Sequence, residues 1–201
     1  MASSLLLSKG LDTLSDEIFN KYCNEILKNT QNLSETIHTF RDFIEGEKEF
    51  KKVVLQELIE STLNVEKIIF DQYHIKLINN IDYKNPISIY TIIGEFNQVL
   101  INLLKNSKDI LVERKIENPW INVNLLERNE NITITIEDNG GGISEDIMQQ
   151  IFEPYFTTKH RSQGTGLGLY ISYKIITENL KGKLYAKNTH NGAMFCIELV
   201  K

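Results

Sequence analysis

Two glycine clusters in the C-terminal half constrain the fold of this chain more than any other feature. The first reads Asp-Asn-Gly-Gly-Gly at residues 138–142, and the second reads Gly-Thr-Gly-Leu-Gly-Leu at residues 164–169. Glycine weakens the interior of helices and strands, so a run of glycines needs a special backbone conformation or the close approach of another group. Both segments are therefore candidate binding loops.

The residues before the first cluster predict a strand with one buried face. Ile132, Ile134 and Ile136 alternate with polar residues over 131–138, which is the period of a β-strand. Asp138 is in phase with the isoleucines, and a carboxylate on the buried side is costly unless hydrogen bonds are donated to it. The amine of a purine would be such a donor. An ordinary Asp-Asn-Gly turn is the alternative.

The second cluster lies where a helix is predicted to begin. Apolar residues follow it with helical spacing, at Leu167, Ile171, Ile175 and Leu180. Unpaired amides and the positive end of the helix dipole attract phosphate at such a position. The spacing does not match the dinucleotide fingerprint, and the chain has no lysine-terminated P-loop. The pattern therefore favours a different kind of phosphate site.

A long helix is predicted from about Glu95 to Lys115, with one apolar face and one polar edge. Asn102 and Asn106 lie one turn apart on that edge. Asparagine is a mediocre helix former, but its amide oxygen is a ligand that magnesium accepts beside phosphates. A solvated polar face is the alternative interpretation.

The N-terminal region predicts a second long helix, from about Ser15 to Glu45. Its apolar residues alternate steps of four and three, at Phe19, Cys23, Ile26, Thr30, Leu33, Ile37, Phe40 and Ile44. This heptad seam is typical of a coiled coil or bundle and predicts pairing with another chain. A helix that lies on its own domain is the alternative.

The remaining patterns predict scaffold. They comprise strands near 50–55, 74–78, 87–91 and 120–126, a helix near 55–70, a short helix over 144–151, and a closing hairpin of 183–187 with 193–200. Pro154 and the polar run 157–163 predict a mobile flap, in which Lys159 and Arg161 are candidates to meet phosphate charge. A solvated loop is the alternative there.

Composition excludes several classes of protein. The chain has 201 residues, 41% hydrophobic content and a net charge of −5, which argues against a nucleic-acid surface. Cys23 and Cys196 form no metal or disulfide set, so a reducing compartment is expected. No signal peptide or membrane span is recognisable, so we expect a cytoplasmic chain without membrane contact, with any membrane anchor of its parent outside these residues.

Four segments resemble, in order and spacing, the N, G1, F and G2 boxes of sensor histidine kinases. They are Asn102–Asp109, Asp138–Gly142, Phe152–Phe156 with Thr157-Thr158-Lys159, and Gly164–Leu169. The resemblance covers about residues 48–201. It implies the GHKL ATP-binding fold, an α+β two-layer sandwich in which helices cover one face of a mixed sheet, here preceded by the long coiled-coil-like helix.

The resemblance also implies roles for individual residues. Asp138 would bind the adenine amine of ATP, Asn106 would hold Mg²⁺, and Asn102 would support the metal and phosphate region. Phe152 and Phe156 would anchor the lid over the nucleotide. The other implied ATP-binding positions are Gly140, Gly142, Lys159, Gly164, Thr165, Gly166, Leu167 and Gly168.

Residues 1–47 resemble part of that family's dimerisation and phosphoacceptor hairpin, chiefly its second helix. This implies a homodimer through the N-terminal helix and a response regulator receiver domain as partner. The acceptor box, a histidine followed within a few residues by Pro-Leu, is missing, since His38 precedes Thr39-Phe40-Arg41. We expect the chain to begin just after the acceptor, and so to bind ATP without phosphorylating itself.

Two other functions remain open. A GHKL-type ATP hydrolase would need a glutamate one turn before the metal-binding asparagine, where this chain has Asn102, which is not a general base near neutral pH. A non-catalytic dimerisation module with a vestigial pocket would retain the fold but not bind nucleotide. The sequence favours a histidine kinase, in which catalysis depends on positioning and charge neutralisation.

Overall fold

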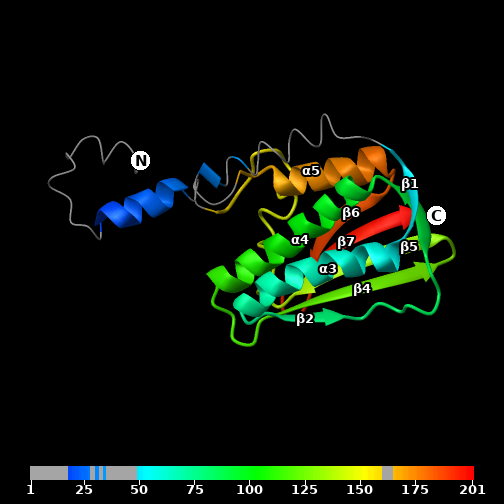
Figure 1. Ribbon diagram of the computed structural model, residues 1–201, viewed down its shortest axis with the longest axis horizontal. Helices are drawn as coiled ribbons and strands as arrows, with labels where there is room; N and C mark the ends of the chain where they lie inside the picture. The colour runs from blue at the N-terminus through cyan, green and yellow to red at the C-terminus, as the bar shows by residue number, and fades with distance from the viewer. Residues whose placement is uncertain (1–17, 28–29, 32–33, 35–48, 160–164) are drawn as a thin grey trace. The chain divides into compact units, whose positions relative to one another are not determined.

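The computed structural model describes residues 18–27, 30–31, 34, 49–159 and 165–201 (Figure 1). The chain divides into two compact units, Met1–Gly46 with Tyr155–Leu167, and Glu47–Pro154 with Gly168–Lys201. In the first unit, residues 18–27 are helical, as the heptad pattern predicts. The seam residues Leu33, Ile37, Phe40 and Ile44 lie outside the described residues, as does His38.

A five-stranded mixed sheet forms the base of the second unit. Its strand order is β2-β4-β5-β7-β6. The strands are β2 (Lys76–Asn79), β4 (Trp120–Arg128), β5 (Asn131–Asp138), β7 (Ala193–Val200) and β6 (Lys183–Asn188). β2 pairs with β4 in parallel, and the other pairs are antiparallel. The mixed sheet and the closing hairpin of β6 and β7 confirm the sequence prediction.

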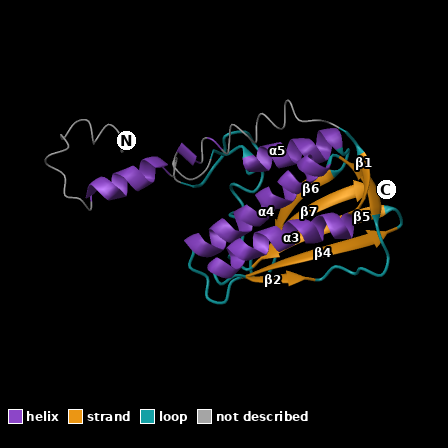
Figure 2. Cartoon of the chain, in the orientation of Figure 1, coloured by secondary structure: helices purple, strands orange, loops and turns teal. Residues whose placement is uncertain are grey.

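Helices cover one face of this sheet (Figure 2). They are α3 (Leu55–Gln72), α4 (Ile93–Glu113) and α5 (Gly168–Lys174), which continues into the π-helical turn η2 (Ile175–Asn179). A small antiparallel sheet of β1 (Lys51–Val54) and β3 (Ser88–Thr91) completes the unit. The observed architecture is the two-layer sandwich that the resemblance implied.

The alternation in β5 explains how the two layers join. Ile132, Ile134 and Ile136 are at most 1% exposed, while Thr133 and Thr135 on the other face are half-buried. The buried side packs under α4, whose core-facing residues are Phe96, Val99, Leu100, Leu103 and Leu104. Burial of each such side chain contributes about 1.5–3 kcal/mol. The same alternation carries the carboxylate at the end of β5 toward the helices.

The short helix predicted over 144–151 is wrong. The segment forms successive turns, in which Ile147 N–H donates to Ser144 O at 3.1 Å and Gln150 N–H to Ile147 O at 2.8 Å. A segment of eight residues cannot sustain a helix by propensity alone, and the Ser144 hydroxyl bonds to the Asp146 side chain instead of capping one. Among the described residues, no helix has the length and apolar composition of a membrane span.

Candidate functional site

Asp138 lies at the end of β5 and is 1% exposed. Its Oδ1 atom accepts hydrogen bonds from the backbone N–H of Gly140 at 2.9 Å and of Ala193 at 3.4 Å. Gly140 follows in the loop after β5, and Ala193 is the first residue of β7. Two neighbouring backbone segments therefore fix the orientation of this carboxyl, and neither bond uses Oδ2.

Burial raises the pKa of the Asp138 carboxyl above its ordinary value. The Gly140 hydrogen bond, the Ser107 side chain, the Ala193 hydrogen bond and the Arg114 charge lower it by smaller amounts. The removal of a carboxylate from water is the dominant physical cause, because a low-dielectric environment disfavours the charged form. A ligand that donates a hydrogen bond to this carboxylate would offset part of that cost.

Ser107 adds a second buried polar atom near Asp138. Its side chain, on α4, is fully buried, and it interacts with the Asp138 carboxyl as a hydrogen-bond donor that lowers the pKa of that group. Buried polar atoms almost always have a partner, in protein or ordered water. The partner of Ser107 is the Asp138 carboxyl, so the two groups form one buried polar pair that a polar ligand could join.

The first glycine cluster packs closely against its neighbours. A Cβ on Gly140 would lie 2.8 Å from Ile110 Cγ2 and 2.9 Å from Asp138 Oδ1. Gly142 has a φ of +80°, and a Cβ there would lie 2.8 Å from Asn188 Oδ1. A larger residue would therefore displace the side chain of Ile110, Asp138 or Asn188, and at Gly142 it would also strain the backbone, so the packing of the site favours glycine here.

Polar side chains hold this loop from three directions. Arg114, at the end of α4, donates from Nη1 to Gly140 O at 2.6 Å and to Gly142 O at 3.1 Å. Asn139 Oδ1 accepts the N–H of Trp120 at 2.8 Å, which ties the loop to β4. Asn188 Oδ1, at the end of β6, accepts the N–H of Ile143 at 2.8 Å.

The sequence interpretation assigned no site role to Arg114, Ser107, Asn139 or Asn188. It placed Gly192 in the turn of the closing hairpin but gave it no role at the site, where a Cβ on Gly192 would lie 2.0 Å from the carbonyl oxygen of Asp138. Gly192 had a signal, because an Asn-Gly pair between two strands predicts a tight turn. Arg114 and Asn188 had none, because their contacts span 26 and 45 positions along the chain.

Asn102 connects α4 to the start of α5. Its Nδ2 atom donates to Gly168 O at 3.3 Å and lies 3.2 Å from Ser172 Oγ, and the Ser172 hydroxyl itself donates to Gly168 O at 2.9 Å. Asn102 therefore fixes the residue at which the glycine-rich segment enters the helix. Asn106 follows one turn later on α4 and is half-buried.

The second glycine cluster belongs mostly to the other compact unit. Within that unit, Tyr155 N–H donates to Gly166 O at 3.0 Å, and the N–H of Lys159 donates to Thr157 Oγ1 at 3.1 Å. Phe156, Thr165 and Leu167 lie in the same unit. Phe152 lies in the sheet unit, where its ring centroid is 5.6 Å from that of Tyr173.

Gly164, His160 and Arg161 lie outside the described residues. In the part of the chain that is described, no group of three or more His, Cys, Asp or Glu side chains is arranged to hold a metal ion. A divalent cation would therefore need ligands of other kinds, such as an asparagine amide oxygen and the oxygens of a bound phosphate.

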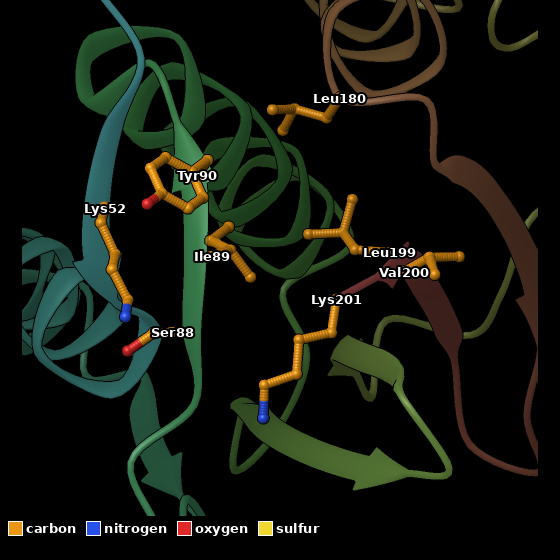
Figure 3. Close-up of a pocket in the computed structure, with 8 residues that line it drawn as sticks. All are labelled: Lys52, Ser88, Ile89, Tyr90, Leu180, Leu199, Val200 and Lys201. Atoms are coloured by element: carbon orange, nitrogen blue, oxygen red, sulfur yellow. The ribbon is translucent and has the colours of Figure 1, made fainter.

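A separate pocket of about 360 Å³ lies between β3 and the C-terminal end of β7 (Figure 3). Ile89 and Tyr90 line it from β3, and Leu199 and Val200 line it from β7. None of the residues that the sequence predicts for the site takes part in this pocket. The candidate site lies instead around Asp138, at the opposite end of β5 and β7.

Known proteins share this fold. Residues 93–201 match the family model described as histidine kinase-, DNA gyrase B-, and HSP90-like ATPase. The catalytic domain of histidine kinase ThkA superposes with a TM-score of 0.67 at 31% identity, covering 76% of this chain and 96% of that domain. A crystal structure of ThkA in complex with response regulator protein TrrA has a TM-score of 0.78 at 23% identity, covers 100% of this chain and 56% of the ThkA chain, and supports the fold alone.

Curated relatives agree with this match. The signal transduction histidine-protein kinase AtoS of Escherichia coli (strain K12) is 30% identical over 188 residues, which are 92% of this chain and 30% of AtoS. Sporulation kinase E of Bacillus subtilis (strain 168) is 32% identical over 143 residues, 71% of this chain and 18% of the kinase. The chain thus spans less than a third of either relative.

The buried carboxylate, the glycine loop and the asparagine edge of α4 thus occur on the fold that the resemblance implied. The matched family model covers all of α4, β4, β5 and the C-terminal elements. The chain belongs to the family of histidine kinase-, DNA gyrase B- and HSP90-like ATPases, and its sheet unit is a nucleotide-binding domain of the sensor histidine kinase type.

Proposed function

We propose that this chain is the ATP-binding catalytic part of a two-component sensor histidine kinase. It transfers the γ-phosphoryl group of ATP to a histidine outside these residues, for relay to the receiver domain of a response regulator. The observation that carries the proposal is the carboxyl of Asp138, which is 1% exposed and lies beside the buried Ser107 hydroxyl. An amine on the adenine ring would add a further donor to this buried carboxylate, beside the backbone N–H groups of Gly140 and Ala193.

The metal and the phosphates are assigned to the asparagine edge and the second glycine cluster. Asn106 is the proposed ligand of Mg²⁺, which takes oxygen ligands and retains several waters beside substrate phosphates. When bound, the ion neutralises the charge that develops on the transferred phosphoryl group. Lys159, Gly164, Thr165, Gly166, Leu167 and Gly168 are the proposed phosphate-binding positions, with Phe152 and Phe156 anchoring the lid.

The geometry of Asn102 favours phosphoryl transfer over hydrolysis. Its amide bonds to Gly168 and Ser172, so this side chain connects two helices at the position where an ATP hydrolase of the family would need a general base. An amide does not accept a proton near neutral pH. We therefore expect very slow ATP hydrolysis by this chain.

Partners follow from the same proposal. Residues 18–27 are helical, and Phe19 on the seam is 37% exposed, which supports a homodimer that buries the seam. Residues 1–47 are the proposed partial dimerisation hairpin, and 48–201 the catalytic domain. The response regulator is proposed as a partner by analogy with ThkA. ThkA shares the fold of this chain, and its crystal structure is a complex with the response regulator protein TrrA. Use of ATP implies a cytoplasmic location.

Calorimetric titration with a non-hydrolysable ATP analogue, with and without Mg²⁺, tests the proposal. We expect saturable binding that Mg²⁺ strengthens, no acid-labile phosphate on the protein after incubation with labelled ATP, and very slow hydrolysis. Absence of binding at millimolar nucleotide would indicate a dimerisation module with a vestigial pocket. Rapid turnover would indicate an ATP hydrolase.

A further inference from the structure

Arg114 connects the end of α4 to the first glycine loop. Its Nη1 atom donates to the carbonyl oxygens of Gly140 at 2.6 Å and of Gly142 at 3.1 Å, so one nitrogen bridges the two sides of the loop. The position of the arginine is set by the helix, since its own N–H donates to Ile110 O at 3.0 Å. The Ile110 side chain packs under Gly140 from the same helix.

The loop that Arg114 holds also orients the carboxyl of Asp138. The N–H of Gly140 donates to Asp138 Oδ1 at 2.9 Å, while the carbonyl of the same residue accepts from Arg114. A change in the position of Gly140 would therefore change the donor on which the carboxyl depends. The guanidinium is thus linked through Gly140 to the carboxyl that is proposed to bind adenine.

We propose that Arg114 is a positioning residue for nucleotide binding. Its guanidinium holds the carbonyl groups of Gly140 and Gly142 in the conformation that presents the Asp138 carboxyl to the adenine ring. This inference rests on the proposed function, because adenine is its ligand. The two N–H groups of Nη1 lie in the fixed plane of the guanidinium, so this nitrogen donates to two carbonyls in an orientation that a rotating lysine ammonium does not fix.

A purely stabilising role is the alternative. Arg114 is exposed and carries a positive charge at the C-terminal end of α4, where the helix dipole favours a cation. Lys115, the next residue, has the same charge and exposure at the same helix end. It therefore offers a matched control, because Lys115→Met removes the same charge without touching the glycine loop.

The test compares Arg114→Met, Arg114→Lys and Lys115→Met with the wild-type chain by calorimetric titration with ATP and with adenosine. We expect Arg114→Met to weaken both ligands by the same factor, about threefold to tenfold, since the loop shapes the base site and not the phosphate site. Arg114→Lys should restore part of the affinity, and Lys115→Met should bind as wild type does.

A second readout does not depend on ligand. In ¹H–¹⁵N spectra of the free protein, the amides of Gly140–Gly142 should shift in Arg114→Met and not in Lys115→Met. Four outcomes would overturn the inference: wild-type affinity in Arg114→Met, an equal loss in Lys115→Met, a loss confined to ATP, or loss of the cooperative unfolding transition in Arg114→Met.

Failure of the proposed function gives a different result. If the wild-type chain bound neither ATP nor adenosine, the nucleotide proposal and the role of Arg114 in it would both be wrong, whatever the spectra showed. If the wild type bound both ligands and Arg114→Met bound them equally well, only the inference about Arg114 would be wrong.

Discussion

The two glycine clusters look alike in the sequence but are built differently in the structure. The first is part of the sheet unit, where the side chains of Arg114 and Asn188 and the backbone N–H of Trp120 bond to it or to its immediate neighbours. The second belongs mostly to the unit containing Tyr155–Leu167, where one backbone bond joins Tyr155 to Gly166. The difference indicates that the packing of the domain itself preorganises the proposed base site, while the proposed phosphate site depends on a separate segment.

The largest expected effect is at Asp138. Asp138→Asn should weaken ATP by about tenfold to a hundredfold, because a hydrogen bond to a charged group contributes about 1.5–3 kcal/mol. Thermal stability should not fall, since the substitution removes a buried charge whose pKa is raised by burial. Calorimetric titration and thermal unfolding measure the two effects.

Glu137→Gln is the control for this prediction, because Glu137 precedes Asp138 on β5 and is only half-buried on the other face of the strand. It should leave ATP affinity unchanged. Unaltered binding in Asp138→Asn would mean that adenine lies elsewhere, and the contrast between the two clusters would lose its basis.

The second prediction concerns pH. ATP affinity should fall as the pH drops through the raised pKa of Asp138, because the protonated carboxyl no longer offers a charged acceptor. The stability of the fold depends on pH in the opposite direction. Between the ordinary pKa of aspartate, about 3.9, and the raised folded value, the folded state binds more protons, so the contribution of this group to unfolding free energy decreases as pH rises.

Titrations at a series of pH values check this expectation, with Asp138→Asn as the reference. In that variant the portion of the pH dependence caused by the carboxyl should disappear. An identical pH profile in both proteins would assign the dependence to another group.

The third prediction tests the close packing of the first cluster. Gly142→Ala should weaken adenosine and ATP about tenfold, because its φ of +80° disfavours a side chain and the new Cβ would lie 2.8 Å from Asn188 Oδ1. Gly94→Ala is the matched control, since a Cβ there meets nothing within 4 Å. It lies in α4 and should raise stability by up to about 0.5–1 kcal/mol without affecting the ligand.

The smallest expected effect is in the second cluster. Gly166→Ala should weaken ATP about threefold and leave adenosine unchanged, since a Cβ there would lie 2.4 Å from the carbonyl carbon of Tyr155, within the segment proposed to contact phosphates. Parallel titrations with the two ligands measure this. An equal loss for adenosine would show that both clusters shape the base site, against the contrast drawn above.

Elements that local interactions form could be predicted from the sequence, and those that depend on contacts between distant residues could not. The bounds of β5 and the phase of Asp138 could be read from alternation, because one buried face imposes a period of two. The helix expected over 144–151 was wrong, because tertiary contacts of Asn188 with Ile143 and local turns decide that segment. Asn102 was correctly placed on the polar edge of α4, but its bonds to Gly168 and Ser172 could not be foreseen.

The sequence by itself determined the strand that ends in Asp138, because hydrophobic periodicity is a local property of the chain. It determined the family and the two-layer fold through the resemblance of four motifs to those of sensor histidine kinases. Only the tertiary structure decided that Arg114 bridges Gly140 and Gly142, that Gly192 packs against the Asp138 backbone, and that Ser107 is buried beside the Asp138 carboxyl. These contacts join residues distant in the chain, and their geometry depends on how α4 and the β6–β7 hairpin pack against the end of β5.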